Sequence, residues 1–149
     1  SAQHILTKQL HSGDFLREYL AVCEGCPSPP AGMVDAPLGR SDDSYIRQEV
    51  RPDGKPARTH YEILDWNGPY SLLRLVLETG RTHQIRVHMA YLGHPLVGDF
   101  LYGTETPELI SRPALHSARL ALAHPFTGER LTFEAPLPAD MTNLIKPIL

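Results

Sequence analysis

Two extended apolar segments joined by a tight turn constrain the fold of this chain more than any other feature. Residues 57–66 and 70–78 have strand-like lengths, and the turn sequence Asn67-Gly68-Pro69 lies between them. The second segment is almost continuously apolar over residues 72–77. Because a half-exposed strand alternates apolar and polar residues, this run predicts a central strand of an antiparallel sheet.

The other periodic segments predict a sheet with few helices. The expected strands are residues 15–22, 115–124 and 130–135, with a short extended piece at 33–38. The expected helices are residues 2–11, 82–92 and a short piece of 136–149. The polar stretch 39–58 contains the turn sequence Pro52-Asp53-Gly54-Lys55. Since strands outnumber helices and most connections are short, we expect an α+β fold. It would have a mixed, mostly antiparallel β-sheet with flanking helices, in one domain over residues 1–149.

Length and hydropathy exclude a membrane-spanning protein at the level of sequence. The chain has 149 residues, which suits a single hydrophobic core. Hydrophobic residues make up 42%, yet no apolar run is long enough to span a bilayer. Residues 1–6 have neither the basic nor the apolar region of a signal peptide. We therefore expect a cytoplasmic protein with no membrane partner.

The charge pattern permits nucleic-acid binding without requiring it. The net charge is -3, from 14 basic and 17 acidic residues, whereas phosphate binding relies on clustered Lys and Arg. Basic residues are nevertheless concentrated locally. Residues 74–94 contain three Arg and three His against one Glu, and residues 40–58 contain five basic against four acidic residues.

The spacing of cysteines and histidines does not predict a metal site. Cys23 and Cys26 form one Cys-x-x-Cys pair, but a structural zinc site needs four ligands, and no second pair stands at finger-like spacing. The prolines of residues 27–30 indicate a loop where a redox motif would need a helix. On the helix expected at 82–92, His83 and His88 would diverge by about 140°. We expect two free thiols and no metal, and a metal-dependent protein is the third-ranked interpretation.

The segment Thr79-Gly80-Arg81-Thr82 interrupts the apolar strand and opens the predicted helix. Backbone N–H groups in the first turn of a helix have no partner within it and attract anions, and Arg81 flanks that turn. Arg86 lies beside the apolar stripe of the helix, so we expect its guanidinium to be partly buried. A buried Arg requires a carboxylate or phosphate partner. The residues alone therefore indicate an anion-binding turn with a buried Arg, and a purely structural ion pair of Arg86 is the alternative.

The same segment carries a family resemblance. Thr79-Gly80-Arg81-Thr82-His83-Gln84-Ile85-Arg86-Val87-His88, followed by Gly93-His94-Pro95-Leu96-Val97-Gly98-Asp99-Phe100-Leu101-Tyr102-Gly103, resembles the signature of RluA-type RNA pseudouridine synthases. Other segments agree in the expected order, namely residues 17–22, 35–40, 54–61, 115–118, 124–125 and 133–136. Ser117 departs from the family's Leu-His-Ala. The resemblance covers nearly the whole chain.

The resemblance implies that a uridine in structured RNA, either rRNA or tRNA, is isomerised to pseudouridine without a metal or cofactor. The target nucleotide flips out of its RNA context, and the uracil is detached, turned and reattached through carbon. In this family Tyr19 would pack against the base and move a proton at its C5, and Arg86 would pair with a catalytic aspartate and keep it ionised. The implied substrate-binding residues are Ile85, Arg81, His83, Gln84 and Arg40. A purely structural hydrogen-bonding role is the alternative for His83 and Gln84.

The family's nucleophile is absent from the sequence. That aspartate acts as a covalent nucleophile within a His-Arg-Leu-Asp-x-x-Thr-Ser-Gly motif, and no such string occurs here. The chain has eight Asp, none of which the motif pattern assigns to this role: Asp14, Asp35, Asp42, Asp43, Asp53, Asp65, Asp99 and Asp140. We therefore expect residues 1–149 to be the C-terminal part of a catalytic domain, inactive alone.

Two further expectations follow from the missing motif. A non-catalytic RNA-binding remnant or a pseudoenzyme is the alternative to an incomplete enzyme. The strand that would follow the motif is also missing, so we expect an exposed sheet edge. Such an edge could pair with the missing N-terminal segment or with another copy of the chain.

Overall fold

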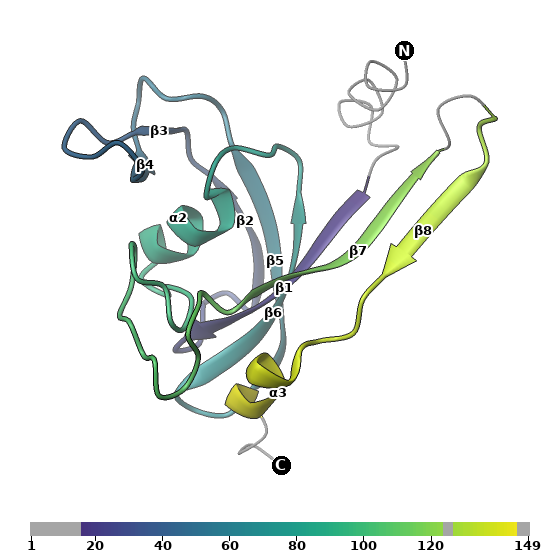
Figure 1. The fold of residues 1–149 in the computed structure, drawn as a ribbon. Helices are drawn as coiled ribbons and strands as arrows, with labels where there is room; N and C mark the ends of the chain where they lie inside the picture. Colours follow the sequence, from purple (N-terminus) through teal and green to yellow (C-terminus); the bar gives the residue numbers. More distant parts are fainter. Residues whose placement is uncertain (1–15, 124–126, 146–149) are drawn as a thin grey trace.

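The computed structural model describes residues 16–123 and 127–145. In these residues a six-stranded sheet, with strand order β2-β5-β6-β1-β7-β8, is accompanied by a two-stranded hairpin and two helices (Figure 1). The elements are β1 (Leu16–Glu24), β2 (Ala31–Asp35), β3 (Leu38–Arg40), β4 (Gln48–Val50), β5 (Arg58–Trp66), β6 (Tyr70–Leu77), α2 (Gln84–Tyr91), β7 (Leu115–Ala123), β8 (Arg130–Glu134) and α3 (Ala139–Ile145). The expected α+β class is confirmed, and every described strand pairing is antiparallel.

β6 lies between β5 and β1 in the middle of the sheet, as its apolar sequence predicted. Its side chains nevertheless alternate between buried and partly buried positions. Leu73 and Leu75 belong to the core cluster that includes residues of α2, whereas Leu72 packs against the cluster that includes residues of α3. The continuous apolar run therefore serves two cores, one on each face of the strand.

The two described helices cover opposite faces of the sheet. Ala21 and Cys23 of β1 belong to the same cluster as Ile85 and Met89 of α2. Val22, between them, belongs to the cluster of α3. Because successive strand residues point to opposite faces, α2 and α3 must lie on different sides of β1.

Ion pairs link five neighbouring strands on the α3 face of the sheet. Arg74 of β6 pairs with Glu18 of β1, and its Nη1 lies 3.0 Å from Oε1 of Glu62 on β5. On β7, Arg119 Nη1 lies 3.9 Å from Glu18 Oε2, and Arg119 Nε lies 3.6 Å from Glu134 Oε1 on β8. Exposed pairs add about 1 kcal/mol or less each, and Glu18, whose side chain is 12% exposed, is the most buried member of this network.

The polar stretch 39–58 contains a hairpin that the sequence pattern did not predict. β3 and β4 pair from Leu38 opposite Val50 to Arg40 opposite Gln48. Each strand has only three residues, which is too short for a period of two to be recognised. The expected turn after this hairpin is present at Pro52 and Asp53.

Most other predicted elements are confirmed with small shifts at their ends. The helix expected at residues 82–92 is α2, and the helix expected near the C-terminus is α3. The helix expected at residues 2–11 lies outside the described residues. Among the described strands the sheet edges are β2 and β8, and β7 and β8 extend away from the rest of the sheet (Figure 1).

Candidate functional site

A cleft lies where β1, the turn after β6 and the start of α2 meet. Its volume is about 310 Å³, within the range of sites for small ligands. The cleft is lined by Arg17, Tyr19, Leu77, Gly80, Arg81, His83, Gln84, Ile85, Arg86 and Leu115. Six of the seven candidate residues from the sequence therefore share one cleft. The exception is Arg40.

Tyr19 and Ile85 supply the apolar part of the cleft. Tyr19 is partly buried and packs against the core cluster that contains Ile85, which is 3% exposed. The pairing of β1 with β7 is irregular between Glu18 and Tyr19, and such a bulge re-aims a side chain relative to a regular strand. An aromatic ring and an aliphatic side chain in one cleft suit the flat faces of a nucleobase.

Arg86 forms a bidentate ion pair with Asp99. Arg86 Nε donates to Asp99 Oδ2 and Nη2 donates to Oδ1, both at 2.9 Å. The Arg86 side chain is 12% exposed and that of Asp99 is 0% exposed. The carboxylate partner that the sequence led us to expect for a buried Arg86 is thus present inside the chain, as in the structural ion-pair alternative. Arg86 Nη1 has no hydrogen-bond partner among the described residues.

The surroundings of this pair favour its charged form. Burial alone would raise the pKa of Asp99, but hydrogen bonds from Arg86 and from the backbone N–H groups of Tyr102 and Leu101 outweigh it and lower the pKa. The hydrogen bonds to Asp99 raise the pKa of Arg86. The Arg86 guanidinium carbon also lies 5.2 Å from the ring centre of Phe100 and 5.3 Å from that of Tyr102, within cation–π range.

Gln84 holds the turn that shapes the cleft. Its Oε1 accepts hydrogen bonds from the Thr79 hydroxyl and the Arg81 backbone N–H, at 2.7 and 3.0 Å. Its Nε2 donates to the Arg58 carbonyl and to Thr59 Oγ1, both at 2.9 Å. The residue is 3% exposed. These contacts favour the structural alternative for Gln84, although the residue lines the cleft.

His83 occupies the N-terminal cap of α2 in a left-handed conformation, with φ 55°. Tyr102 Oη accepts the Gln48 backbone N–H at 2.9 Å and lies 2.8 Å from His83 Nδ1. In the neutral His83 ring, which its lowered pKa favours, Nδ1 can accept the proton of the Tyr102 hydroxyl. Burial, followed by the charge of Arg86, lowers the pKa of His83. Tyr102 therefore connects the cleft to the β3–β4 hairpin.

The structure separates Arg40 from the other candidate residues. Arg40 lines a neighbouring hollow of about 480 Å³, between the hairpin and the turn before α2. Arg81 lines both this hollow and the cleft, and its Nε donates to the Pro56 carbonyl at 2.8 Å.

Sequence reasoning missed several residues around the site. Arg17 and Leu115 line the cleft. Outside the cleft lining, Asp99 binds Arg86 and Tyr102 contacts His83. The period of two along β1, which places Arg17 on the face of Tyr19, could have identified Arg17. The contacts of Asp99 and Tyr102 depend on chain segments brought together only by the fold.

The cleft lining contains no carboxylate among the described residues. Asp99 contacts Arg86 but does not line the cleft, and other described Asp side chains pair with arginines elsewhere, such as Asp35 with Arg58 and Asp140 with Arg112. Among the described residues no three His, Cys, Asp or Glu side chains are grouped so that they could hold a metal ion. The cysteines are free, and burial raises the pKa of the Cys23 thiol to about 12. No helix in the described part of the chain is both long and apolar enough to cross a bilayer.

A family model described as RNA pseudouridylate synthase matches residues 1–91, more than half of the chain. The chain belongs to the RNA pseudouridylate synthase family. It is 43% identical over 160 residues to ribosomal large subunit pseudouridine synthase D of Pasteurella multocida, covering 99% of this chain and 49% of that protein. These matches confirm the RluA-type resemblance.

A second relative is the Bacillus subtilis protein called "Uncharacterized RNA pseudouridine synthase YjbO". It is 51% identical over 145 residues, which are 97% of this chain and 51% of that protein. The chain thus spans about half the length of the curated relatives it matches.

Solved pseudouridylate synthase structures share the fold. Human RNA Pseudouridylate Synthase Domain Containing 1 superposes with a TM-score of 0.75 at 25% identity, covering 97% of this chain and 70% of the human one. Human RNA Pseudouridylate Synthase Domain Containing 4 has the same TM-score at 22% identity, a likeness of fold alone.

Proposed function

We propose that this protein supplies the base-binding and cationic part of an RNA pseudouridine synthase active site. The observation that carries the proposal is the meeting of Tyr19, Ile85 and Arg86 in one cleft. In this proposal residues 1–149 are a single partial domain, the C-terminal part of the catalytic domain of a longer enzyme.

Each of these side chains has a distinct task in the isomerisation. The uracil, once detached from the ribose, must be held while it turns, and the ring of Tyr19 with the side chain of Ile85 gives it two apolar surfaces. The Tyr19 hydroxyl is the group that moves the proton at C5 of the base. That proton must leave when the new carbon–carbon bond to the ribose has formed.

Arg86 is the group that keeps the nucleophilic carboxylate ionised. A guanidinium within about 4–6 Å of a carboxylate lowers the pKa of that carboxyl group. Asp99 fixes Arg86 in place through Nε and Nη2, which leaves Nη1 for the nucleophile. Arg81 and Arg86 line the cleft, and no carboxylate belongs to its described lining, so the site can accept the carboxylate of the nucleophile.

The nucleophile itself comes from a segment that carries the family's His-Arg-Leu-Asp motif, which these residues lack. The 149-residue chain alone is therefore inactive. The substrate is a uridine in structured RNA, and rRNA is favoured over tRNA because a relative is named for the large ribosomal subunit. An rRNA substrate would put the enzyme in the cytoplasm.

Tritium release tests this function directly, because the C5 hydrogen of uridine is lost when the glycosidic bond moves to C5. We would incubate ribosomal RNA that carries [5-³H]uridine with the 149-residue chain and with a longer chain that includes a His-Arg-Leu-Asp segment. The longer chain is expected to release tritium and the shorter one is not. Turnover by the 149-residue chain would refute the proposed source of the nucleophile, and no release by either would refute the enzyme.

A non-catalytic RNA-binding protein is the second candidate, and the lack of a carboxylate in the described cleft lining favours it. In that case the longer chain would bind RNA and release no tritium. Tritium release by the longer chain therefore distinguishes the enzyme from the non-catalytic RNA-binding protein.

We also propose that an edge of the sheet pairs with the missing N-terminal segment or with another copy. β8 is the more suitable edge, because it extends away from the rest of the sheet with β7 (Figure 1) and exposes 56% of Phe133. A monomer in sedimentation velocity at high concentration would exclude the second copy.

A further inference from the structure

A second hollow continues the candidate active-site cleft. It has a volume of about 480 Å³ and lies between the β3–β4 hairpin and the turn before α2. Its lining consists of Leu38, Gly39, Arg40, Gln48, Asp53, Gly54, Lys55, Gly80, Arg81 and Thr82. Gly80 and Arg81 also line the cleft, so the two spaces adjoin at these residues. An RNA strand that leaves the cleft past Arg81 would enter this hollow. Figure 1 shows the hairpin beside the chain that leads into α2.

The hollow is positively charged although the chain as a whole is not. Arg40, Lys55 and Arg81 line it, and Asp53 is its one carboxylate. None of the three cations forms an ion pair with a described residue. Asp53 is neutralised by Arg51, whose Nε and Nη2 donate to its two oxygens at 2.9 and 3.2 Å. Three available cations in a chain of net charge -3 indicate an anionic ligand.

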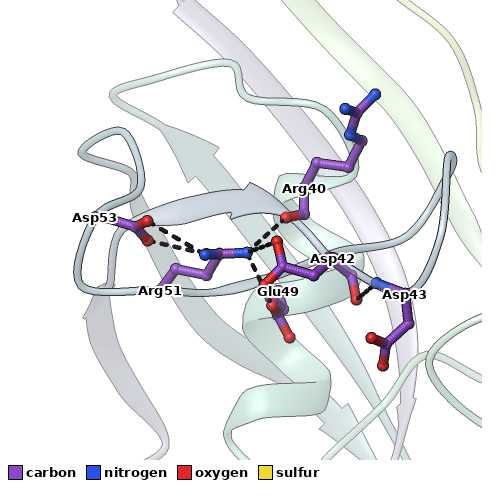
Figure 2. Close-up of polar contacts among 7 residues, drawn as sticks. Arg40, Asp42, Asp43, Glu49, Arg51 and Asp53 are labelled. Carbon is purple, nitrogen blue, oxygen red and sulfur yellow. Dashed lines mark hydrogen bonds and ion pairs between the residues drawn. The ribbon is translucent and has the colours of Figure 1, made fainter.

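Arg51 holds two carboxylates of the hairpin region, those of Asp42 and Asp53, in ion pairs. Figure 2 shows its guanidinium between Asp53 and Asp42, where Nη1 donates to Asp42 Oδ1 at 2.8 Å and to the Arg40 carbonyl at 3.1 Å. The guanidinium of Arg40 points away from this network (Figure 2). Arg51 thus neutralises Asp42 and Asp53, and the guanidinium of Arg40 remains available to a ligand.

The backbone that carries Lys55 is fixed. Leu38 and Lys55 exchange backbone hydrogen bonds at 2.9 and 2.8 Å. A Cβ on Gly54 would lie 2.6 Å from the Leu38 carbonyl carbon and oxygen, so the chain passes close there. Lys55 is therefore held at the hollow by a preformed backbone, which reduces the ordering cost of binding.

An exposed aromatic ring lies beyond Arg40. Tyr45, in the connection between β3 and β4, is 92% exposed and lines a third hollow together with Arg40. Exposed aromatic rings beside a basic groove are typical of surfaces that bind single-stranded nucleic acid, because bases stack on them. The carboxylate of Asp43 in the third hollow marks the outer limit of the positive surface.

We propose that this groove, formed by Arg81, Lys55 and Arg40, binds the phosphates of the RNA strand that adjoins the target uridine, and that Tyr45 stacks on a base at its far end. The inference rests on the proposed function, because the cleft must hold the flipped uridine for its neighbours to reach the groove. A single RNA strand fits the observations, since the groove offers spaced cations and one terminal aromatic face. The hairpin is also tied to the cleft, because the Gln48 N–H donates to Tyr102, which contacts His83.

The test measures binding of a fluorescein-labelled 12-nucleotide RNA strand to the protein at its natural length, by anisotropy at several salt concentrations. The double variant Arg40→Ala/Lys55→Ala is expected to bind more weakly and to reduce the slope of log K against log salt by about 0.7 to 1 per removed contact. Arg119→Ala removes one positive charge on the α3 face of the sheet, outside the groove, and is the control for the loss per removed charge. It is expected to leave the slope within error of wild type.

Two further variants separate the contacts from a folding defect. Tyr45→Ser is expected to weaken binding about 5-fold or more with an unchanged salt slope, because stacking releases no counterions. Asp53→Asn is expected to tighten binding, since it removes the one carboxylate of the groove, and a loosened hairpin would not produce that gain.

If Arg40→Ala/Lys55→Ala keeps the affinity and salt slope of wild type, the proposed RNA-binding role of the groove is wrong. It is also wrong if Arg119→Ala loses as much RNA affinity as the double variant. Tritium release from [5-³H]uridine RNA, measured in parallel, reports on the proposed function separately. If wild type releases tritium and the groove variants bind RNA as tightly as wild type, only the RNA-binding role of the groove is refuted. A loss of binding in these variants without release from wild type would support the groove and refute the enzyme.

Discussion

Arg86 and Asp99 meet through two parallel hydrogen bonds of 2.9 Å, with the Asp99 carboxylate fully buried. The pair joins the helix of the candidate site to the loop that follows it, since Asp99 lies eight residues after the helix ends at Tyr91. Asp99 also accepts the backbone N–H groups of Leu101 and Tyr102, so one carboxylate fixes both the cation of the cleft and the loop behind it.

Asp99→Asn is expected to lower the free energy of unfolding by about 3–5 kcal/mol, because it leaves the Arg86 charge buried without a counter-charge. Urea unfolding followed by circular dichroism measures the loss. Asp140→Asn is the matched control: Asp140 accepts the same bidentate pair from Arg112, but both side chains are 39% exposed. That variant is expected to lose about 1 kcal/mol or less. Equal losses would show that burial of the Arg86 pair is not decisive.

If the longer chain with the His-Arg-Leu-Asp segment is active as proposed, Arg86→Lys is expected to lower its kcat for tritium release about 100-fold, with a smaller change in KM. Lysine keeps the charge but cannot donate in parallel to Asp99 and also present a further donor to the nucleophile. Arg74→Lys, which alters a cation on the α3 face, serves as the control and should retain wild-type kcat. A kcat of Arg86→Lys near that of wild type would contradict the proposed role of Arg86.

The free energy of unfolding is expected to fall as the pH drops below about 6.5, because of His88. Its Nε2 donates to the Ala36 carbonyl at 2.9 Å and its Nδ1 accepts from the Thr59 hydroxyl at 2.8 Å, which only the neutral ring can do. Burial lowers the pKa of His88, so the unfolded chain binds the proton first as pH falls. Stability is therefore full above about pH 6.5 and is lost toward the lower folded-state pKa.

Urea titrations between pH 5 and 7.5 measure this dependence. His88→Gln should flatten it, even though the variant is less stable at every pH. His83, whose pKa burial also lowers, accounts for a remaining slope of the same sign. A slope as steep in His88→Gln as in wild type would assign the effect to other groups. The contribution of Asp99, whose pKa is also lowered, appears separately below about pH 4.

Gly98→Ala is expected to cost about 3 kcal/mol or more of unfolding free energy. Gly98 has a φ of 79°, and a Cβ there would lie 2.5 Å from the Arg112 carbonyl oxygen and 2.7 Å from Ile110 Cγ2. Gly93→Ala is the control, since Gly93 has a φ of 88° with open space around it. The control should lose only the strain of a positive φ, about 1–2 kcal/mol. Similar losses in both variants would mean that the close approach at Gly98 relaxes freely.

Local pattern was enough for the regular elements but not for the short ones. The turn at residues 67–69 and the apolar run of β6 predicted a central hairpin, and β5 and β6 form it. The three-residue strands β3 and β4 carry no readable period, so the hairpin that holds Arg40 was missed. The run in β6 was interpreted as burial of one continuous strand, whereas Leu72 and Leu73 serve cores on opposite faces.

The sequence by itself determined the α+β class, because repeating apolar patterns are local properties of the chain. Its long motifs carried the resemblance that implied the family and a site with Tyr19, Ile85 and Arg86. Only the tertiary structure decided what Arg86 pairs with and where Arg40 lies. Asp99 binds Arg86, and Tyr102 contacts His83, from the loop after α2. Arg51 forms ion pairs with Asp42 and Asp53, which lie on either side of it in the sequence. Such partners are chosen by distance and burial in the folded chain, which spacing along the sequence does not encode.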